Sequence, residues 1–353
     1  MATLELGFQP LLRERFPDRT LFIDTRFRWR DTRSYDRRRE GPARRLLGLA
    51  RALGRAGWVS HRQPYDVVVS RCLGPVNSEG QSWAGHAARV VMGAVFRSLV
   101  LYAARGGRVK LAVLDQTDHI SIHPRDRKLL RRCQLYFKRE LADNHWHTLE
   151  AVLPRGACAG ATRHLPAGVA LRAKLRPFSL GIEVAAITRP LPDREKAYDL
   201  FYAGTAAGIP VREGLDAVLA AVAGMGWRVF APRERLTSDG FREAVRRSRL
   251  CLSPGGVGWD CYRHYEVVAY GSLPVMNYRP TQSIAPFRHG CECFYYDPQG
   301  DLTGRLDEWL RLPGERLDRM VAAAQEHLRR HFTFDALAEY VVRELERLPD
   351  STA

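Results

Sequence analysis

The chain has 353 residues, which at typical domain sizes of about 100–150 residues predicts two domains. A hydrophobic fraction of 45% is ordinary for a globular protein, so the chain can bury a sizeable core. No apolar run reaches the ~20 residues needed to span a bilayer, and the first residues lack the apolar segment of a secretory signal. We therefore expect neither a membrane-spanning nor a secreted protein.

The charge is strongly positive, at a formal net +16, and nearly all of it comes from arginine. Such a bias is typical of proteins from GC-rich genomes, but it also fits contact with an anionic membrane surface, an anionic glycan or nucleic acid. The 7 cysteines form an odd and scattered set, which indicates reduced thiols. We expect a cytoplasmic protein, with peripheral contact to the inner membrane surface as one option.

The first half alternates apolar strands with helices, which indicates an α/β domain with a parallel sheet. The run at 65–70 is rich in valine and predicts a strand that is buried on both faces. The predicted elements, in chain order, are a strand at 21–24, a helix at 44–57, a strand at 65–70, a helix at 82–105 and strands at 110–115 and 134–138.

Residues 183–197 contain two prolines and a cluster of charges, and they predict a linker between two domains. A second α/β unit follows, and the chain ends in helices at 302–312, 315–331 and 334–348. Its predicted strands lie at 198–203, 227–231, 249–253, 273–276 and 293–296, with helices at 211–224, 238–248 and 260–270. The expected division is an N-terminal Rossmann-like domain at 1–190, a C-terminal one at 191–330 and a helical tail at 331–353 that packs back on the first domain.

The stretch SPGGVGWDCYRHYE at 253–266 carries the clearest chemistry. A glycine-rich loop here follows a strand and opens a helix, an arrangement whose backbone N–H groups and helix dipole attract anions. Arg263 can add a bidentate charge to a phosphate, and Glu266, one turn along, can accept hydrogen bonds from a diol. The pattern predicts a pocket for a nucleotide-sugar diphosphate, against the simpler interpretation of a strand–turn–helix connection with surface charges. The donor contacts expected from this stretch are Ser253, Gly255, Gly256, Gly258, Asp260, Tyr262, Arg263 and Glu266, with Asp260 also a candidate helix N-cap.

The run SPGGVGWDCYRHYEVVAYGSLPVM resembles the donor-binding core of exostosin-like and related GT-B glycosyltransferases. The resemblance extends over residues 198–300 and becomes diffuse before them. It implies a GT-B fold, with two Rossmann-like domains facing across a cleft, and a nucleotide-activated sugar as donor, UDP- or GDP-linked first. It further implies that Glu266 binds the ribose, that the loop and Arg263 face the diphosphate, and that the first domain reads a glycan, lipid-linked or protein acceptor.

Three further basic residues are candidates for the donor site. Arg212 follows the loop 204–210, at the first strand-to-helix turn of the second unit, where α/β sheets place ligands. Lys138 and Arg139 follow a strand of the first unit and could bind a phosphate or an acidic acceptor, although such a pair is more often a solvated surface.

An inverting transfer needs a general base near the acceptor hydroxyl, whereas a retaining one needs none. Asp118 and His119, adjoining at a strand end of the first domain, are the first candidates, and Glu79 and His86 are the next. We expect no cofactor and no metal ion. The His289–Cys293 and His145–His147 clusters lack zinc-site spacing, and the family resemblance implies that a helix dipole and arginine hold the diphosphate.

Two alternatives stay open at this point. A DNA-base glycosyltransferase would keep the chemistry and use the basic first domain to bind DNA phosphates. A non-catalytic nucleotide-sugar-binding protein would keep the fold and turn over no donor. A basic stripe along the interdomain cleft would favour DNA, a basic patch at one tip of the first domain would favour a membrane, and scattered arginines would favour neither.

Overall fold

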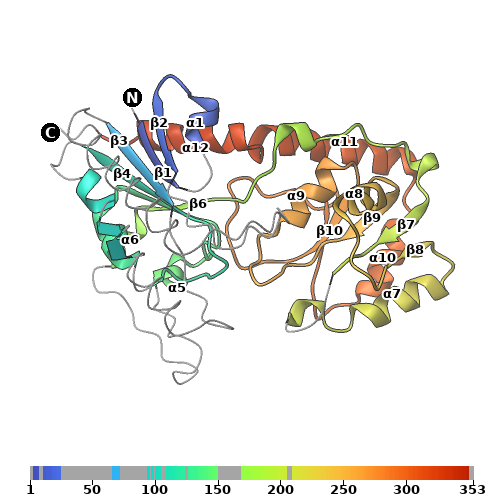
Figure 1. Ribbon diagram of the computed structural model, residues 1–353. Helices are drawn as coiled ribbons and strands as arrows, with labels where there is room; N and C mark the ends of the chain where they lie inside the picture. The colour runs from blue at the N-terminus through green and yellow to red at the C-terminus, as the bar shows by residue number, and fades with distance from the viewer. Residues whose placement is uncertain are drawn as a thin grey trace, which may run out of the picture.

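The protein contains two parallel β-sheets, each flanked by helices, in two halves that lie side by side (Figure 1). The predicted class, two Rossmann-like α/β units followed by C-terminal helices, is confirmed. The computed structural model describes residues 3–7, 11–24, 66–71, 94–95, 97–98, 100–104, 109–123, 126–149, 168–204 and 209–349. Within these ranges no helix is long and apolar enough to cross a membrane. The predicted helix at 44–57 lies outside them.

The first sheet has six parallel strands in the order β2-β1-β3-β4-β5-β6. The predicted strands at 21–24, 65–70, 110–115 and 134–138 are confirmed within one or two residues. Two strands were missed: β1, which has five residues, and β6, which is a three-residue edge strand that ends in a proline. The bounds are β1 (Thr3–Gly7), β2 (Thr20–Asp24), β3 (Val67–Arg71), β4 (Lys110–Asp115), β5 (Leu135–Lys138) and β6 (Leu175–Pro177).

Helices cover both faces of this first sheet. Its helices from the N-terminal half are α1 (Leu12–Arg15), α4 (Arg127–Arg132), α5 (His145–Leu149) and α6 (Gly168–Arg172). Alternate strand residues divide between two cores, as a two-residue period requires. Val68 and Val113 pack with α4 and α6, whereas Val69 and Phe137 pack with α1 and with the C-terminal helix α12 (Phe334–Glu346). The end of the chain therefore completes the first domain.

The second sheet has five parallel strands in the order β11-β10-β9-β7-β8. The chain moves outward from β7 to β8 on one side and from β9 to β11 on the other, so the order reverses between β7 and β9. In open α/β sheets, ligands bind beyond the carboxyl ends of the strands at such a point. The bounds are β7 (Tyr198–Phe201), β8 (Val229–Phe230), β9 (Ser248–Leu252), β10 (Leu273–Asn277) and β11 (Phe294–Tyr296).

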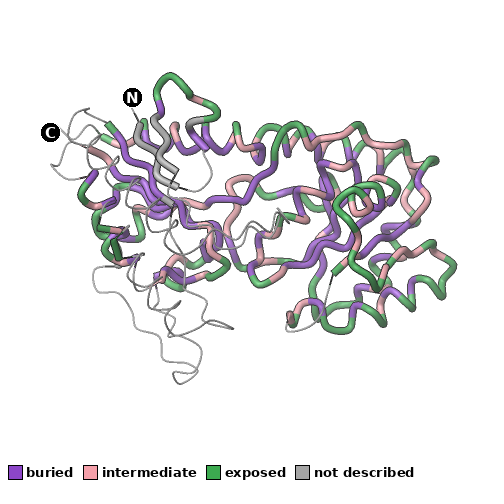
Figure 2. Tube along the Cα trace, viewed as in Figure 1, coloured by how far each residue is buried: buried purple, intermediate pink, exposed green. Residues whose placement is uncertain are grey.

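The central strands of the second sheet, β9 and β10, are buried on both faces, whereas the edge strand β8 is half-buried (Figure 2). Phe201 and Cys251 pack with α8 and α9, and Leu200 and Leu250 belong to the larger core that also holds side chains of α7 and α10. The helices are α7 (Leu215–Gly224), α8 (Ser238–Arg246), α9 (Tyr262–Ala269), α10 (Leu302–Leu310) and α11 (Gly314–His331). The helix predicted from residue 211 begins later, because Pro210–Arg212 forms a 3-10 turn.

The chain crosses between the two halves twice, and the two crossings lie against each other. The Ile182 N–H donates to the Phe332 carbonyl at 2.9 Å, and the Phe334 N–H donates to the Ile182 carbonyl at 3.0 Å. Gly181 has a φ of 71°, and a Cβ there would lie 3.1 Å from the Phe332 carbonyl oxygen. A glycine is required where the crossings pack this closely.

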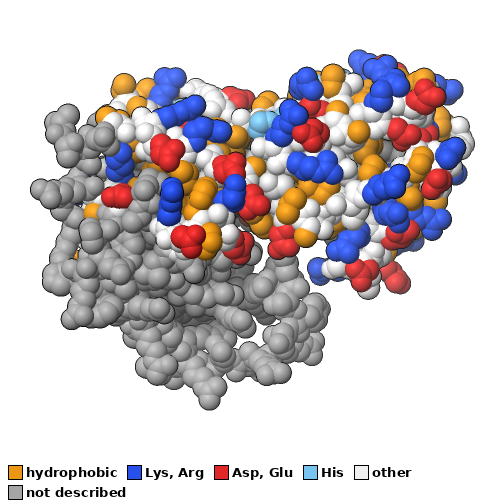
Figure 3. Space-filling model, turned by 90° about the horizontal axis from the view of Figure 1, so that it is seen from above, with side chains coloured by type: hydrophobic (Ala, Val, Ile, Leu, Met, Phe, Trp, Pro, Cys, Tyr) orange, Lys and Arg blue, Asp and Glu red, His pale blue; other side chains and the backbone are white. Residues whose placement is uncertain are grey.

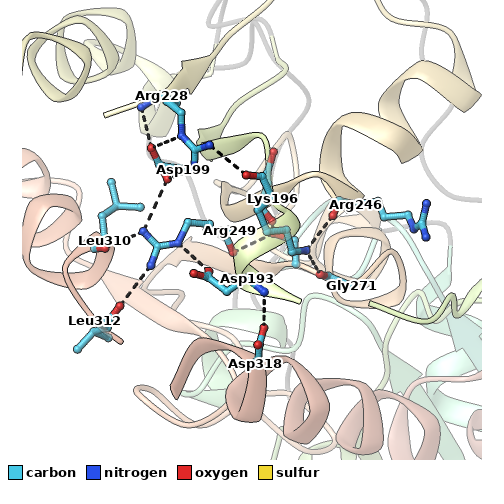
Figure 4. A network of polar contacts seen from close by, with 12 residues as sticks. Asp193, Lys196, Asp199, Arg228, Arg246, Arg249, Gly271, Leu310, Leu312 and Asp318 are labelled. Atoms are coloured by element: carbon cyan, nitrogen blue, oxygen red, sulfur yellow. Dashed lines mark hydrogen bonds and ion pairs between the residues drawn. The ribbon is translucent and has the colours of Figure 1, made fainter. Parts of the chain in front are cut away.

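The predicted linker is anchored to the second half over its final residues (Figure 4). The Lys196 ammonium donates to the Gly271 carbonyl at 2.7 Å, and Asp193 accepts from Arg249 at 2.7 Å. The backbone N–H of Asp193 also donates to Asp318, on α11, at 3.0 Å. Residues 193–196 are therefore part of the second half, and the passage between the halves lies before them.

Candidate active site

The glycine-rich loop between β9 and α9 lies at the carboxyl end of β9, beside the reversal of strand order. Its two ends are held together by His264, which is only 6% exposed. The His264 Nδ1 lies 2.8 Å from the Ser253 hydroxyl, and its Nε2 lies 3.0 Å from the Trp259 carbonyl oxygen. A carbonyl only accepts, so Nε2 carries the proton and Nδ1 accepts from Ser253. Burial lowers the pKa of His264 to about 4, which keeps the ring neutral.

The first glycines of the loop use their backbone groups inside the protein. The Gly255 N–H donates to the Asn277 side chain at 2.8 Å, and the Gly255 carbonyl accepts from Arg212 Nε at 3.0 Å. The Gly256 N–H donates to the Gly258 carbonyl at 2.8 Å. These bonds form a rigid turn, so the positive charge at this edge comes from side chains more than from these two amides.

Two guanidinium groups face this edge of the sheet. Arg212 is 7% exposed and follows β7, and half-buried Arg263 belongs to the first turn of α9. Burial lowers the pKa of Arg212, and the positive charge of Arg263 lowers it further. Among the described residues, the Nε and Nη1 atoms of Arg263 are buried without a hydrogen-bond partner. Two adjacent cations, one with orphaned donors, favour an anionic ligand.

Two buried tyrosines complete the cluster. Tyr202 follows β7 and Tyr296 ends β11, and within the described chain both hydroxyls are buried without a hydrogen-bond partner. Burial raises the pKa of both phenols, and Arg212 opposes the rise in each, which places that guanidinium near both rings. Neither tyrosine was predicted from the sequence. The available signal was their position at the carboxyl ends of strands, Tyr202 after β7 at the reversal and Tyr296 at the end of the edge strand β11.

Glu266 and Tyr262 lie on α9 with Arg263. Spacings of three and four residues place the side chains of Tyr262, Arg263 and Glu266 on neighbouring parts of one helix face. Tyr262 is 37% exposed and Glu266 is half-buried. Their helix begins at the loop, so a ligand held by Arg263 is within one helical turn of the Glu266 carboxylate.

Asp260 is 3% exposed and has internal partners. Its carboxylate accepts from the Leu180 N–H at 3.0 Å and from the Tyr265 hydroxyl, and it lies 3.4 Å from Arg279. The N-cap of α9 is Cys261, so the expected capping role of Asp260 was wrong. Asp260 ties the loop to the chain crossing beside Leu180, and its carboxylate is engaged by groups of the protein.

Lys138 is fully buried inside the first half. Its ammonium lies 3.3 Å from Asp115 and 3.0 Å from the Thr117 hydroxyl. Burial acts to raise the pKa of Asp115, but Lys138 and hydrogen bonds from Thr117 and Tyr136 outweigh it, and the pKa is lowered. The ammonium neutralises this internal carboxylate, so Lys138 is not available for the donor contact expected from sequence.

The loop meets the first half at a compact junction around Gly258. The Asp260 N–H donates to Glu140 at 3.0 Å, and Arg139, 5% exposed, pairs with Asp118 and lies 3.3 Å from Glu140. A Cβ on Gly258 would lie 2.6 Å from Arg139 Nη2. A larger residue at Gly258 would thus displace the ends of side chains of the first half, and the bond from the Asp260 N–H to Glu140 joins the two halves here. Sequence reasoning named Arg139 but not its partner Glu140.

Two of the four candidate bases, Asp118 and His119, belong to the described residues and lie near this junction. Asp118 and His119 are exposed residues of the loop after β4, and the Asp118 carboxylate is paired with Arg139. His119 adjoins it and faces solvent. Glu79 and His86 lie outside the described residues.

In the described part of the chain, no group of three or more histidine, cysteine or acidic side chains is arranged to hold a metal ion. His145 and His147 lie on α5, where His145 contacts Gln282 at 3.2 Å. His289 Nδ1 accepts from the Tyr295 N–H at 2.9 Å. Both clusters considered from sequence have histidines engaged in hydrogen bonds.

Two parallel Rossmann-like sheets, a polar cluster at the strand-order reversal of the second sheet, and a C-terminal helix that returns to the first sheet define the GT-B fold. Solved structures agree. UDP-bound HepE from Anabaena is 12% identical, with 99% of this chain and 100% of that chain covered and a TM-score of 0.51. Sucrose-phosphate synthase from Thermosynechococcus elongatus is 8% identical, with 98% and 99% covered and a TM-score of 0.54. A glycosyltransferase from Rickettsia africae is 8% identical, with 99% of each chain covered and a TM-score of 0.53.

A family model described as the RXYLT1 C-terminal domain matches residues 222–292, the segment that contains β9, the glycine-rich loop and α9. A comparison with curated proteins gave no match. At sequence identities this low, the structural similarity shows the fold alone. The match to the family model falls on the segment whose geometry is described above.

Proposed function

We propose that the protein is a glycosyltransferase that moves a sugar from a nucleotide diphosphate donor to an acceptor hydroxyl. One observation carries the proposal: the guanidinium of Arg263 and the hydroxyls of Tyr202 and Tyr296 are buried without partners in the described chain, beside Arg212. Leaving a buried polar group unpaired costs about 1–3 kcal/mol. A diphosphate would supply both the acceptor oxygens and the negative charge that this cluster lacks.

In this proposal the diphosphate lies between Arg212 and Arg263, and Glu266 accepts hydrogen bonds from the ribose diol. The amides of Gly255 and Gly256 are bonded within the protein, so in this proposal the two guanidinium side chains make the contacts to the phosphates. Negative charge grows on the leaving diphosphate as the glycosidic bond breaks, and fixed guanidinium groups stabilise that charge. The resemblance of residues 253–276 to exostosin-like enzymes and the UDP complex of HepE support a UDP-sugar as the first donor to test, with a GDP-sugar next.

The acceptor would be a glycan, a lipid-linked sugar or a protein hydroxyl, presented across the cleft by the domain at 1–190. His119, or Asp118 once released from Arg139, would act as base if the reaction inverts. We keep 191–330 as the donor domain and 331–353 as the returning tail. On the face shown in Figure 3, basic and acidic side chains of the described residues are intermixed and form no continuous basic stripe. By the criterion given above, such scattered charges on this face favour neither DNA nor a membrane surface.

A thermal-shift screen of the full chain against UDP, GDP, CDP and TDP, followed by their sugars, tests the proposal. A ligand at 100 times its Kd stabilises the native state by about 2.7 kcal/mol. We expect one diphosphate to stabilise the protein, its sugar to be hydrolysed slowly or transferred, and Arg263→Ala to weaken the stabilisation. The absence of stabilisation by every diphosphate, or equal stabilisation of Arg263→Ala, would contradict it.

A further inference from the structure

A second concave site lies at the edge of the second sheet, outside the arginine pair. It is a cavity of about 700 Å³ at the carboxyl ends of β10 and β11 and at the start of α10. This volume is within the range of about 300–1,000 Å³ that small-molecule sites occupy. The proposed donor chemistry does not use it.

Three aromatic rings form one wall of the cavity. The rings of Tyr278 and Tyr295 stack with centroids 5.4 Å apart at an interplanar angle of 20°, and His289 stacks on Tyr295 at 6.5 Å and 21°. We call these three residues the aromatic ladder. Tyr278, at its outer end, is 56% exposed, and the His289 ring is fixed by the hydrogen bond from the Tyr295 N–H. Nearly parallel rings with an exposed end form a preset flat surface.

Carboxylates lie beside the aromatic ladder. Asp297 accepts from the Gln299 N–H at 3.0 Å and Asp301 accepts from the Gly304 N–H at 2.9 Å, so each carboxylate is held in place through one oxygen. Arg305, also in the lining, pairs with Glu308 at 2.8 Å. Three carboxylates and one guanidinium leave the lining net negative. Such a lining disfavours phosphates and acidic sugars, and it suits a ligand rich in hydroxyl donors.

Tyr296 joins this cavity to the proposed donor site. It lines the cavity, it is 4% exposed, and its buried hydroxyl has no hydrogen-bond partner among the described residues. Arg212 and Tyr202 act electrostatically on the same phenol, so the donor cluster lies just beyond it. A ligand in the cavity is therefore separated from the diphosphate position by one side chain.

A second cavity of about 370 Å³ continues the groove toward the first half. It shares Tyr278 and Tyr295 with the first cavity and reaches Asp143 and Gln282 at the contact between the halves. The two tyrosines of the aromatic ladder thus line both cavities, and the second cavity adds about 370 Å³ beside the first.

We propose that this groove binds a neutral oligosaccharide, with one pyranose face on the aromatic ladder and its hydroxyls on Asp297 and Asp301. A sugar ring has an apolar face of C–H groups that packs on an aromatic ring, and hydroxyl donors at its edge suit carboxylates. If the protein is the glycosyltransferase proposed above, on which this assignment of role rests, the oligosaccharide is its acceptor and is held by the second domain as well as by the first.

The test uses the fluorescently labelled full chain on a printed array of neutral, sialylated and phosphorylated glycans, with Kd values of the best-bound neutral glycan measured by calorimetry. We expect Tyr278→Ala to weaken its binding about tenfold, as truncation of an aromatic anchor does, and Tyr278→Phe to restore most of it. Tyr102→Ala, at another exposed tyrosine on the first domain, is the matched control and is expected to bind as the unmodified chain does.

Binding of UDP is measured on the same samples. Retention of the glycan by Arg263→Ala, with UDP binding weakened, supports two separate sites. Glycan binding without any nucleotide binding would leave the groove in place and refute only the donor site. Capture of no neutral glycan, preference for acidic glycans, or unchanged affinity in Tyr278→Ala would overturn the inference.

Discussion

Replacement of Arg263 by alanine should change ligand affinity and protein stability in opposite directions. Arg263 supplies two buried donor atoms without partners in the described chain, and its charge acts on Arg212 as a like charge. A bound diphosphate would accept hydrogen bonds from these donor atoms and would offset the repulsion between the two guanidinium groups. Loss of charge-assisted hydrogen bonds worth about 1.5–3 kcal/mol should weaken UDP binding about 10- to 150-fold.

Without ligand, the same substitution removes an unfavourable arrangement. The orphaned donors cost about 1–3 kcal/mol, whereas the contact of Arg263 with the Phe241 ring, at 5.9 Å from its centroid, is worth about 0.5–1 kcal/mol. We therefore expect the free energy of unfolding of the ligand-free protein to rise by about 1 kcal/mol, with a small increase in Tm.

Scanning calorimetry with and without UDP measures both quantities, and Arg263→Lys serves as the matched variant. Lysine keeps the charge but not the bidentate geometry, so it should restore part of the affinity and little of the stability gain. A lower Tm for the alanine variant together with unchanged UDP affinity would refute the reasoning, because Arg263 would then stabilise the fold and bind nothing.

Three further results are expected. Glu266→Ala should weaken UDP binding about tenfold or more, and an unchanged calorimetric affinity would show that the Glu266 carboxylate does not contact the ribose. Gly258→Ala should displace the ends of Arg139 and Glu140 and weaken the junction between the halves, so the rate in transfer assays should fall and Tm should drop slightly; an unchanged rate and Tm would contradict this. The pKa of His264 is lowered to about 4 in the folded protein, against about 6.5 in the unfolded chain. Between these pH values the unfolded chain binds more protons than the folded protein. The free energy of unfolding should therefore fall by up to about 3 kcal/mol as the pH drops from 6.5 to 4. Urea unfolding at pH 7 and pH 5 measures this change in the free energy of unfolding, and the change should be smaller in His264→Gln.

The regular elements of the second half could be predicted closely because their central strands are buried on both faces. Leu250, Cys251 and Leu252 form an unbroken apolar run that ends at a glycine-rich loop, and this pattern predicts a buried parallel strand. β6 could not be predicted, because three residues carry no period and their pairing with β5 depends on tertiary contacts. The strand predicted at 227–231 is likewise shorter in the structure, where β8 has only the two residues Val229 and Phe230.

The sequence located the candidate site but could not assign each side chain within it. The role of Arg263 could be predicted, because it depends only on the local pattern of a glycine-rich loop that opens a helix. Lys138 and Tyr296 depend on which way a residue at a strand end points, and Lys138 points into the first domain whereas Tyr296 joins the arginine cluster. Asp260 shows the same limit, because its partners Leu180 and Arg279 come from distant parts of the chain.

The position of α12 bears on the order in which the protein folds during synthesis. The second half is continuous in sequence, so it can form as soon as its strands and helices have left the ribosome. The first half cannot, because one face of its sheet, including Val69 and Phe137, is covered by Leu337 and Val341 of the final helix. At about 5–20 residues per second, that apolar face stays open for tens of seconds after β5 is made. The domain synthesised first is thus completed after the second one, when α12 becomes able to pack on its sheet.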